Sequence, residues 1–193
     1  MPLIDDVTFY SSAIKKHGIT AKGVNWASKE NQLLRFKMIL DFLPKDLTDF
    51  TIVDAGCGFG DFYHYLLKKK RVPKKYIGID SLTDMHSIAS NATGQEIIHA
   101  NICTQQLPTA DYYICSGALN VLTPFESYQF IQNCYASSRV GFIFNALYGE
   151  TESETYNYIK PSQLKDMLLT LNVTTKREAK DYIQNDITLG FYR

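Results

Sequence analysis

The sequence predicts an α/β protein whose mostly parallel sheet carries helices on both faces. Short apolar runs of strand length alternate with amphipathic stretches of helix length along the 193 residues. The β-branched run at residues 51–54 ends in Asp54 and breaks at once into alternate glycines. A second run, residues 76–80, also ends in an acid, Asp80. An acid at the carboxyl end of the second strand is expected to lie beside a ligand bound at this edge of the sheet.

Residues 1–45 are expected to form an N-terminal helical cap segment. Ser28 is a typical N-cap, and the apolar stripe from Leu33 to Leu43 predicts a helix over residues 29–42, which Pro44 helps to end. Periodicity before residue 28 is weak and indicates only a short helix beginning near residue 7.

The glycine turn is the feature around which the other elements are placed. Gly56, Gly58 and Gly60 let the backbone turn tightly and approach a ligand that a Cβ atom would exclude. A helix over residues 62–70 follows, and its first amides have no partner inside the helix, so we expect them to point into the turn. A tight turn without a ligand is the alternative.

The remaining elements continue the alternation in a single domain, residues 1–193. Loops at the carboxyl ends of parallel strands carry specificity, so the polar, aromatic-rich segment 146–160 is predicted to be a substrate lid, with a solvated connector as the alternative. Helices are expected at 82–91, 124–136 and 161–171, and strands at 96–100, 111–116, 140–145, 173–176 and 186–192.

An acid followed by one residue and then G-x-G-x-G resembles motif I of the class I S-adenosylmethionine (SAM) dependent methyltransferases. The dinucleotide fingerprint G-x-G-x-x-G would need its third glycine where this chain has Asp61. Residues 23–36 and 182–192 are similar to a bacterial group of small, largely uncharacterised members of the same family. The resemblance implies a seven-stranded sheet of order 3-2-1-4-5-7-6 with its last strand antiparallel.

The resemblance also implies SAM as the cofactor. Asp80 would accept hydrogen bonds from the ribose hydroxyls, and Arg35 would hold the methionine carboxylate. Asn101, which replaces the family's acid, would accept from the adenine amine. The implied cofactor residues are Trp26, Arg35, Asp54, Gly56, Cys57, Gly58, Gly60, Asp80, Ser81, Asn101, Ile102, Ser116 and Gly117. Alternatively, Trp26 packs in the core and Arg35 pairs with an acid of the protein surface.

The methyl acceptor is predicted to be a small molecule, with Asn120 and Tyr148 as candidate contacts. Residues 116–120 occupy the place of motif IV but read Ser-Gly-Ala-Leu-Asn, so an exocyclic amine of DNA is a poor substrate. Twenty basic and twenty acidic side chains cancel, which disfavours nucleic acid and anionic membranes as partners. No catalytic residue is predicted, because in-line methyl transfer depends mainly on positioning.

Two other functional classes remain open. The chain would also fit a non-catalytic protein that binds SAM or its product S-adenosylhomocysteine (SAH) as a sensor or partner subunit. The glycine spacing disfavours a nicotinamide-dependent oxidoreductase. Four widely spaced cysteines indicate reduced, buried thiols in a cytoplasmic protein without a zinc site, and the N-terminus does not resemble a secretory signal.

Overall fold

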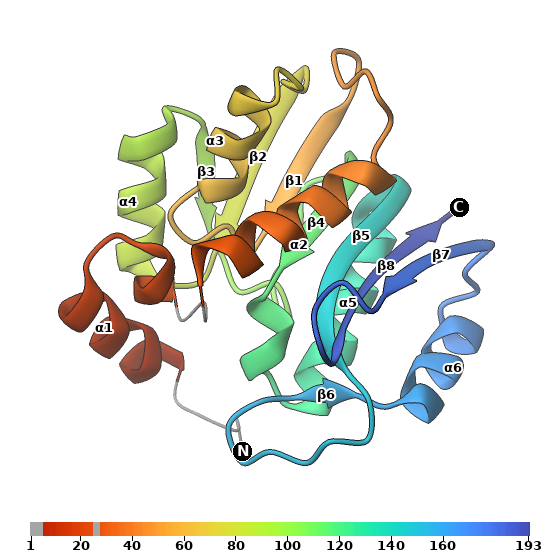
Figure 1. Ribbon diagram of the computed structural model, residues 1–193. Helices are drawn as coiled ribbons and strands as arrows, with labels where there is room; N and C mark the ends of the chain where they lie inside the picture. The colour runs from red at the N-terminus through yellow and green to blue at the C-terminus, as the bar shows by residue number, and fades with distance from the viewer. Residues whose placement is uncertain (1–5, 25–27) are drawn as a thin grey trace.

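The computed structural model describes residues 6–24 and 28–193, which form an eight-stranded sheet covered by helices (Figure 1). The strand order is β3-β2-β1-β4-β5-β8-β7, and the short β6 pairs with β5 off this path. The predicted α/β fold and strand order are therefore confirmed, with β7 and β8 in the places of predicted strands 6 and 7. The strands are β1 Thr51–Ala55, β2 Lys75–Asp80, β3 Glu96–His99, β4 Ala110–Ser116, β5 Ser138–Tyr148, β6 Tyr158–Ile159, β7 Thr175–Lys180 and β8 Asp186–Tyr192.

Parallel pairing aligns the carboxyl ends of the central strands at one edge of the sheet. Asp54 of β1 is the register partner of Gly78 in β2 and of Ile114 in β4. Strand β8 runs antiparallel to β5, so Asp186 at its start lies beside the carboxyl end of β5. Asp54, near the end of β1, and Asp80, at the end of β2, therefore lie at the edge of the sheet where β4 ends.

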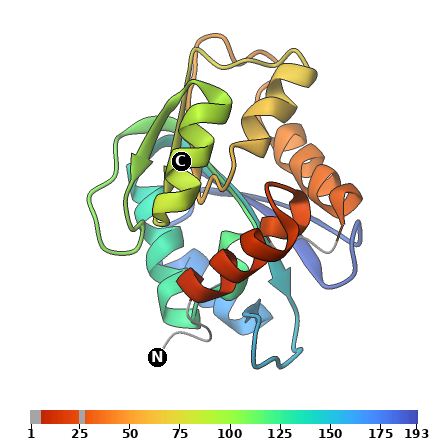
Figure 2. The same ribbon diagram turned by 90° about the vertical axis from the view of Figure 1, so that its left-hand side faces the viewer.

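Helices cover both faces of the sheet (Figures 1 and 2). Helices α2 and α3 pack on one face in a cluster that includes Phe36, Phe62 and Ile143. On the other face, α5 and α6 pack against the stacked rings of Phe142 and Phe144. The helices are α1 Asp6–His17, η1 Ala21–Val24, α2 Lys29–Phe42, α3 Asp61–Lys68, α4 Thr83–Thr93, η2 Ala118–Val121, α5 Pro124–Ser137 and α6 Pro161–Thr170.

Side-chain caps explain where the best-defined helices begin. The Ser28 hydroxyl accepts a hydrogen bond from the Asn31 amide (3.1 Å), as predicted for the helix over residues 29–42. Helix α5 begins with a capping box in which Thr123 and Glu126 satisfy each other's backbone amides. None of the helices described in residues 6–24 and 28–193 has the length and apolar character needed to cross a membrane.

Strands β5 and β7 differ most from their predicted bounds, because pairing with neighbouring strands sets their length. Ser138 pairs with Ala110 of β4 and Tyr148 with Ile159 of β6, whereas β7 pairs with β8. Strand β5 covers residues 138–148 instead of 140–145, and its polar Asn145 lies opposite Thr188 of β8. The edge strand β7 covers 175–180 instead of 173–176. Its exposed, charged side chains show no apolar alternation, so its backbone pairing with β8 could not be read from the sequence.

Candidate functional site

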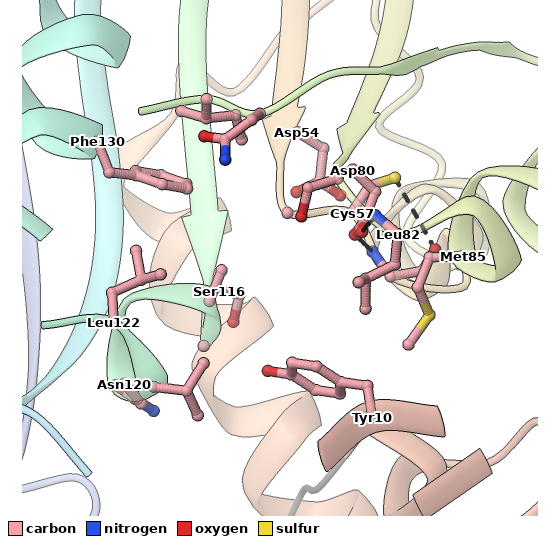
Figure 3. A pocket seen from close by; sticks show the side chains of 18 of the residues that line it. Tyr10, Asp54, Cys57, Asp80, Leu82, Met85, Ser116, Asn120, Leu122 and Phe130 are labelled. Carbon is pink, nitrogen blue, oxygen red and sulfur yellow. Dashed lines mark hydrogen bonds between the residues drawn. The ribbon is translucent and has the colours of Figure 1, made fainter. Parts of the chain in front are cut away.

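A cavity of about 410 Å³ lies at the carboxyl ends of β1, β2 and β4 (Figure 3). This edge of an α/β sheet, where the strand order reverses, is the usual place for a ligand, and the volume suits a nucleoside-sized molecule. Helix α1 contributes Phe9 and Tyr10 to its wall, and the first turn of α5 contributes Phe125 and Glu126. The cavity thus brings together segments that lie far apart in the sequence.

The glycine turn presents a bare backbone surface to the cavity. Gly56 and Gly58 line the cavity and have φ angles of +75° and +54°, a region that disfavours residues with a Cβ atom. The amides of Gly56 and Cys57 donate to the Ile79 carbonyl oxygen at 2.8 and 3.1 Å, and the Gly58 amide donates to Asp80. These three amides have partners inside the protein, so the turn itself is poorly suited to cradle a diphosphate. The expected orientation of the first amides of α3 stays a prediction.

Asp54 lines the cavity with a buried carboxyl group that is 3% exposed. Burial raises its pKa to about 7, the hydrogen bond from the Tyr76 hydroxyl (2.6 Å) opposes the shift, and the nearby Asp80 and Asp61 carboxylates add to it. Because burial disfavours the ionised form of this carboxyl group, a positively charged ligand beside it would stabilise the carboxylate strongly. Asp54 therefore fits a cationic group better than an anionic one.

Asp80 links the end of β2 to the glycine turn. Its Oδ2 atom accepts from the Gly58 amide (2.9 Å), and its Oδ1 atom accepts from the Leu82 amide (3.0 Å). Figure 3 shows the Asp54 and Asp80 carboxyl groups side by side at the cavity.

The segments after β2 and β3 contribute Ser81, Asn101 and Ile102 to the cavity wall. Ile102 is buried, whereas Ser81 and Asn101 are exposed. The Asn101 Oδ1 atom, expected to accept from an adenine amine, accepts from the Cys103 amide (2.9 Å). The side chain thus supports its own loop.

Ser116, Gly117 and Asn120 line the cavity where β4 ends. Gly117 has a φ angle of +94° and begins the short helix η2. The Asn120 Oδ1 atom accepts from the Leu147 amide (3.1 Å), which ties this turn to the end of β5. Because Oδ1 is used in this way, Nδ2 is the end of the Asn120 side chain that can donate to a ligand.

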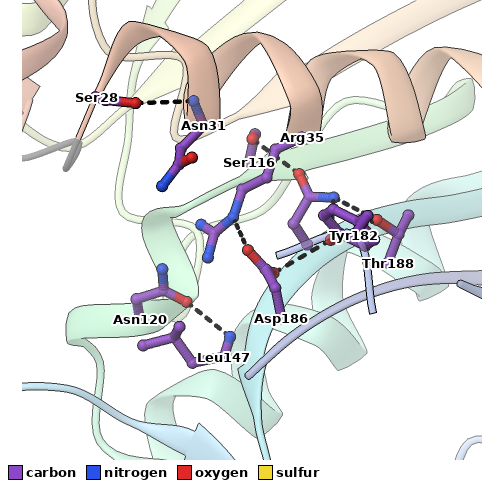
Figure 4. A network of polar contacts seen from close by, with 10 residues as sticks. Ser28, Asn31, Arg35, Ser116, Asn120, Leu147, Tyr182, Asp186 and Thr188 are labelled. Atoms are coloured by element: carbon purple, nitrogen blue, oxygen red, sulfur yellow. Dashed lines mark hydrogen bonds and ion pairs between the residues drawn. The ribbon is translucent and has the colours of Figure 1, made fainter. Parts of the chain in front are cut away.

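Arg35 projects from α2 to the cavity and forms a buried ion pair with Asp186 of β8 (Figure 4). The guanidinium Nε atom donates to Asp186 Oδ2, and the two side chains are 7% and 0% exposed. The expected alternative of a surface acid is wrong, because its partner lies in the core. A bidentate contact with a ligand carboxylate would have to use the terminal nitrogens.

Two of the predicted residues do not line the cavity, and one falls outside the described residues. Gly60 caps α3, and a Cβ atom there would lie 2.3 Å from Thr93 Cγ2, so its glycine serves packing against α4. Tyr148 lies at the end of β5, where the Lys180 ammonium group stacks over its ring at 4.7 Å. Trp26 belongs to residues 25–27, which the structure does not describe.

Sequence reasoning missed the aromatic side chains that surround the cavity. Phe9 and Tyr10 come from the weakly periodic N-terminal segment, Phe125 from the start of α5, and Tyr156 from the predicted lid. Phe125 is 68% exposed and Tyr156 is 38% exposed. The sequence signalled only Tyr156, through the aromatic content of its segment.

Comparisons with known proteins agree with this geometry. Residues 52–141 match a family model described as a methyltransferase domain. No curated protein matches the sequence. Among solved structures, magnesium protoporphyrin IX methyltransferase from Synechocystis superposes with a TM-score of 0.71 at 14% identity, covering 98% of each chain.

Two further structures show the same fold. A SAM-dependent methyltransferase from Leishmania major has a TM-score of 0.71 at 16% identity, over 100% of this chain and 88% of its own. A possible histamine N-methyltransferase from Thermotoga maritima has a TM-score of 0.66 at 12% identity, over 97% and 95% of the two chains. Identities this low establish the fold alone.

Residues 52–141 thus match a methyltransferase domain, and the chain has the fold of solved SAM-dependent methyltransferases. The resemblance predicted from motif I is confirmed, and the domain implies SAM as its cofactor. The narrower resemblance to a bacterial group stays a prediction.

Proposed function

We propose that this protein transfers a methyl group from SAM to a small-molecule acceptor bound in the same cavity. The observation that carries the proposal is the pairing of a bare glycine turn with two adjacent carboxyl groups, Asp54 and Asp80, at the edge of the sheet. SAM supplies an electrophilic methyl group on a sulfonium, and it carries an ammonium but no phosphate. These charges match the acids at the turn, where the Gly56, Cys57 and Gly58 amides already donate to partners within the protein.

The individual site residues have separate roles in this proposal. Asp80 accepts hydrogen bonds from the ribose, Asp54 lies near the cationic methionine end, and Ile102 provides an apolar surface for the base. Arg35 uses its terminal guanidinium nitrogens for the methionine carboxylate. These assignments are those that the family resemblance implies, and they are supported by the fact that all four residues line the cavity.

A small acceptor is supported by the charge balance and by the structural relatives. The chain carries equal numbers of basic and acidic side chains, so no general positive field attracts a polyanion. The Synechocystis relative is named for a porphyrin substrate, and the Thermotoga protein is described as a possible histamine methyltransferase. Both names refer to small molecules.

Residues 149–157, between β5 and β6, form the central part of the proposed lid. The Asn157 amide donates to the Asn120 carbonyl oxygen, and its Nδ2 atom donates to Ser127 Oγ, both at 2.8 Å. These bonds hold one end of the loop against the turn that follows β4. Tyr156 is placed beside the cavity next to this attachment.

Calorimetric titration with SAM tests the proposal directly. We expect a dissociation constant on the order of micromolar, near −8 kcal/mol, and loss of measurable binding in Asp80→Ala. Binding that survives Asp80→Ala would remove the ribose assignment, and binding of NADH in place of SAM would overturn the proposal. Incubation with labelled SAM and cell extract then tests catalysis, because tight binding without methyl transfer would indicate a sensor or partner subunit.

A further inference from the structure

Three polar side chains form a row across three neighbouring strands on the face covered by α2. Ser116 of β4 is the register partner of Asn145 in β5, and Asn145 is the register partner of Thr188 in β8. Asn145 and Thr188 are fully buried, beside an apolar cluster that contains Ile143. Buried polar groups must be hydrogen-bonded, and this row leads from the core to the cavity at Ser116.

The direction of each hydrogen bond in the row is set from its buried end. Burial raises the pKa of the Asp186 carboxyl group, and the Arg35 guanidinium opposes that rise; in this ion pair Asp186 acts as a hydrogen-bond acceptor. The Tyr182 hydroxyl must then donate to Asp186 Oδ1 (3.2 Å). With its one hydrogen used, the Tyr182 oxygen accepts from the Thr188 hydroxyl at 2.8 Å.

The same reasoning orients Asn145. The Thr188 oxygen accepts from Asn145 Nδ2 at 2.7 Å, so the other end of the amide, Oδ1, faces Ser116. A carbonyl oxygen cannot donate, and the Ser116 hydroxyl therefore donates to it at 2.9 Å. Figure 4 shows this chain of contacts from Asp186 to Ser116.

The single hydrogen of Ser116 is thus directed into the protein, away from the cavity that its side chain lines (Figure 3). Toward a ligand, Ser116 Oγ can only accept. A carboxylate, an ether oxygen or a fully substituted nitrogen at this position has only lone pairs to offer, so it would be repelled by the Ser116 oxygen. A ligand with an O–H or N–H would complete the hydrogen bonding of the serine.

We propose that Ser116 determines specificity for the methyl acceptor by selecting molecules that present an O–H or N–H group at the end of β4. Alcohols, phenols and primary or secondary amines meet this requirement. The inference rests on the proposed function, and it assigns Ser116, which the family resemblance implied as a cofactor contact, to the acceptor end of the cavity. Asn145 and Thr188 are positioning residues that act through Ser116.

Matched pairs of small probes test the inference by binding rather than by turnover. The protein is first saturated with SAH, with binding verified by calorimetry, so that the probes meet only the acceptor end. Phenol and anisole, aniline and N,N-dimethylaniline, and indole and 1-methylindole are then titrated by ligand-observed NMR. In each pair the first member should bind about tenfold more tightly or better, because the methylated member leaves Ser116 without a donor.

Three variants separate this role from a structural one. In Ser116→Ala the preference within each pair should fall to near unity, and in Thr188→Val it should shrink because the Asn145 amide is no longer oriented. Ser138→Ala is the matched control: Ser138 begins β5, away from the cavity, and its hydroxyl donates to the Tyr135 carbonyl oxygen at 2.8 Å. This variant should keep the preference.

The outcomes distinguish this inference from the proposed function. Equal binding within the pairs, an unchanged preference in Ser116→Ala, or no probe binding at millimolar concentration to SAH-loaded protein would overturn the role of Ser116 alone. Failure of the wild-type protein to bind SAH would overturn the proposed function and this inference with it.

Discussion

The buried carboxyl group of Asp54 should make binding of SAM depend on pH near neutrality. Its ordinary pKa of 3.8 rises to about 7 because burial disfavours the ionised form. A ligand that carries an ammonium and a sulfonium favours ionisation, so binding should release a proton wherever free Asp54 is protonated. The rise of the Asp54 pKa from 3.8 to about 7 means that burial makes ionisation less favourable by about 4 kcal/mol. The positive charge of bound SAM can recover part of this free energy.

The size of the effect follows from the fraction of protein that holds the proton. At about pH 8 roughly one molecule in ten is protonated at Asp54, and at about pH 6 roughly nine in ten are. The affinity for SAM should therefore fall about tenfold from pH 8 to pH 6. Tyr76→Phe removes a hydrogen bond that lowers the pKa, so its midpoint should move to higher pH.

Calorimetry in buffers of different ionisation enthalpy measures both the affinity and the released proton. The groups that act on Asp54 are Tyr76, Asp80 and Asp61. Asp54→Asn is the matched variant, because it keeps an acceptor for Tyr76 but cannot ionise, and its affinity should be nearly flat between pH 6 and pH 8. An equal slope in wild type and Asp54→Asn, or no proton release in the wild type, would refute the reasoning.

Four further predictions concern stability. Folded Asp54 keeps a proton that the unfolded chain releases between about pH 4 and pH 7, so the free energy of unfolding should fall as pH rises through this window, by up to about 4 kcal/mol in urea titrations. Arg35→Leu leaves Asp186 buried without its charge partner and should cost about 3 to 5 kcal/mol, most of it restored by adding Asp186→Leu; an unchanged denaturation midpoint in the single variant would argue against the ion pair. Both Gly60 and Gly94 have positive φ angles, so an alanine at either position should cost roughly 1 to 2 kcal/mol of stability. Gly60→Ala should lower the thermal midpoint more than Gly94→Ala, because only at Gly60 would the new Cβ atom also clash with Thr93. Asn157→Ala should cost about 1 to 3 kcal/mol and speed hydrogen exchange across residues 149–157, and equal exchange in both proteins would show that Asn157 does not hold this loop.

The sequence by itself determined the elements that local patterns encode. The apolar stripe over residues 29–42 and the N-cap at Ser28 set α2, and the bounds of β8 also agree with the prediction. Motif I placed Asp54 and the glycine turn, because the spacing of glycines and acids constrains the backbone within a few residues. The end of β2 at Asp80 followed from the same local reasoning.

Only the tertiary structure decided which side chains surround the cavity and how they are paired. Phe9 and Tyr10 reach the cavity because helix α1 folds back beside it, and no periodicity in the sequence encodes that position. Arg35 and Asp186 are separated by 151 positions, and their pairing depends on β8 entering the sheet beside β5. The hydrogen direction at Ser116 depends on the same strand, since a hydroxyl group takes its orientation from partners that the chain brings together only when it folds.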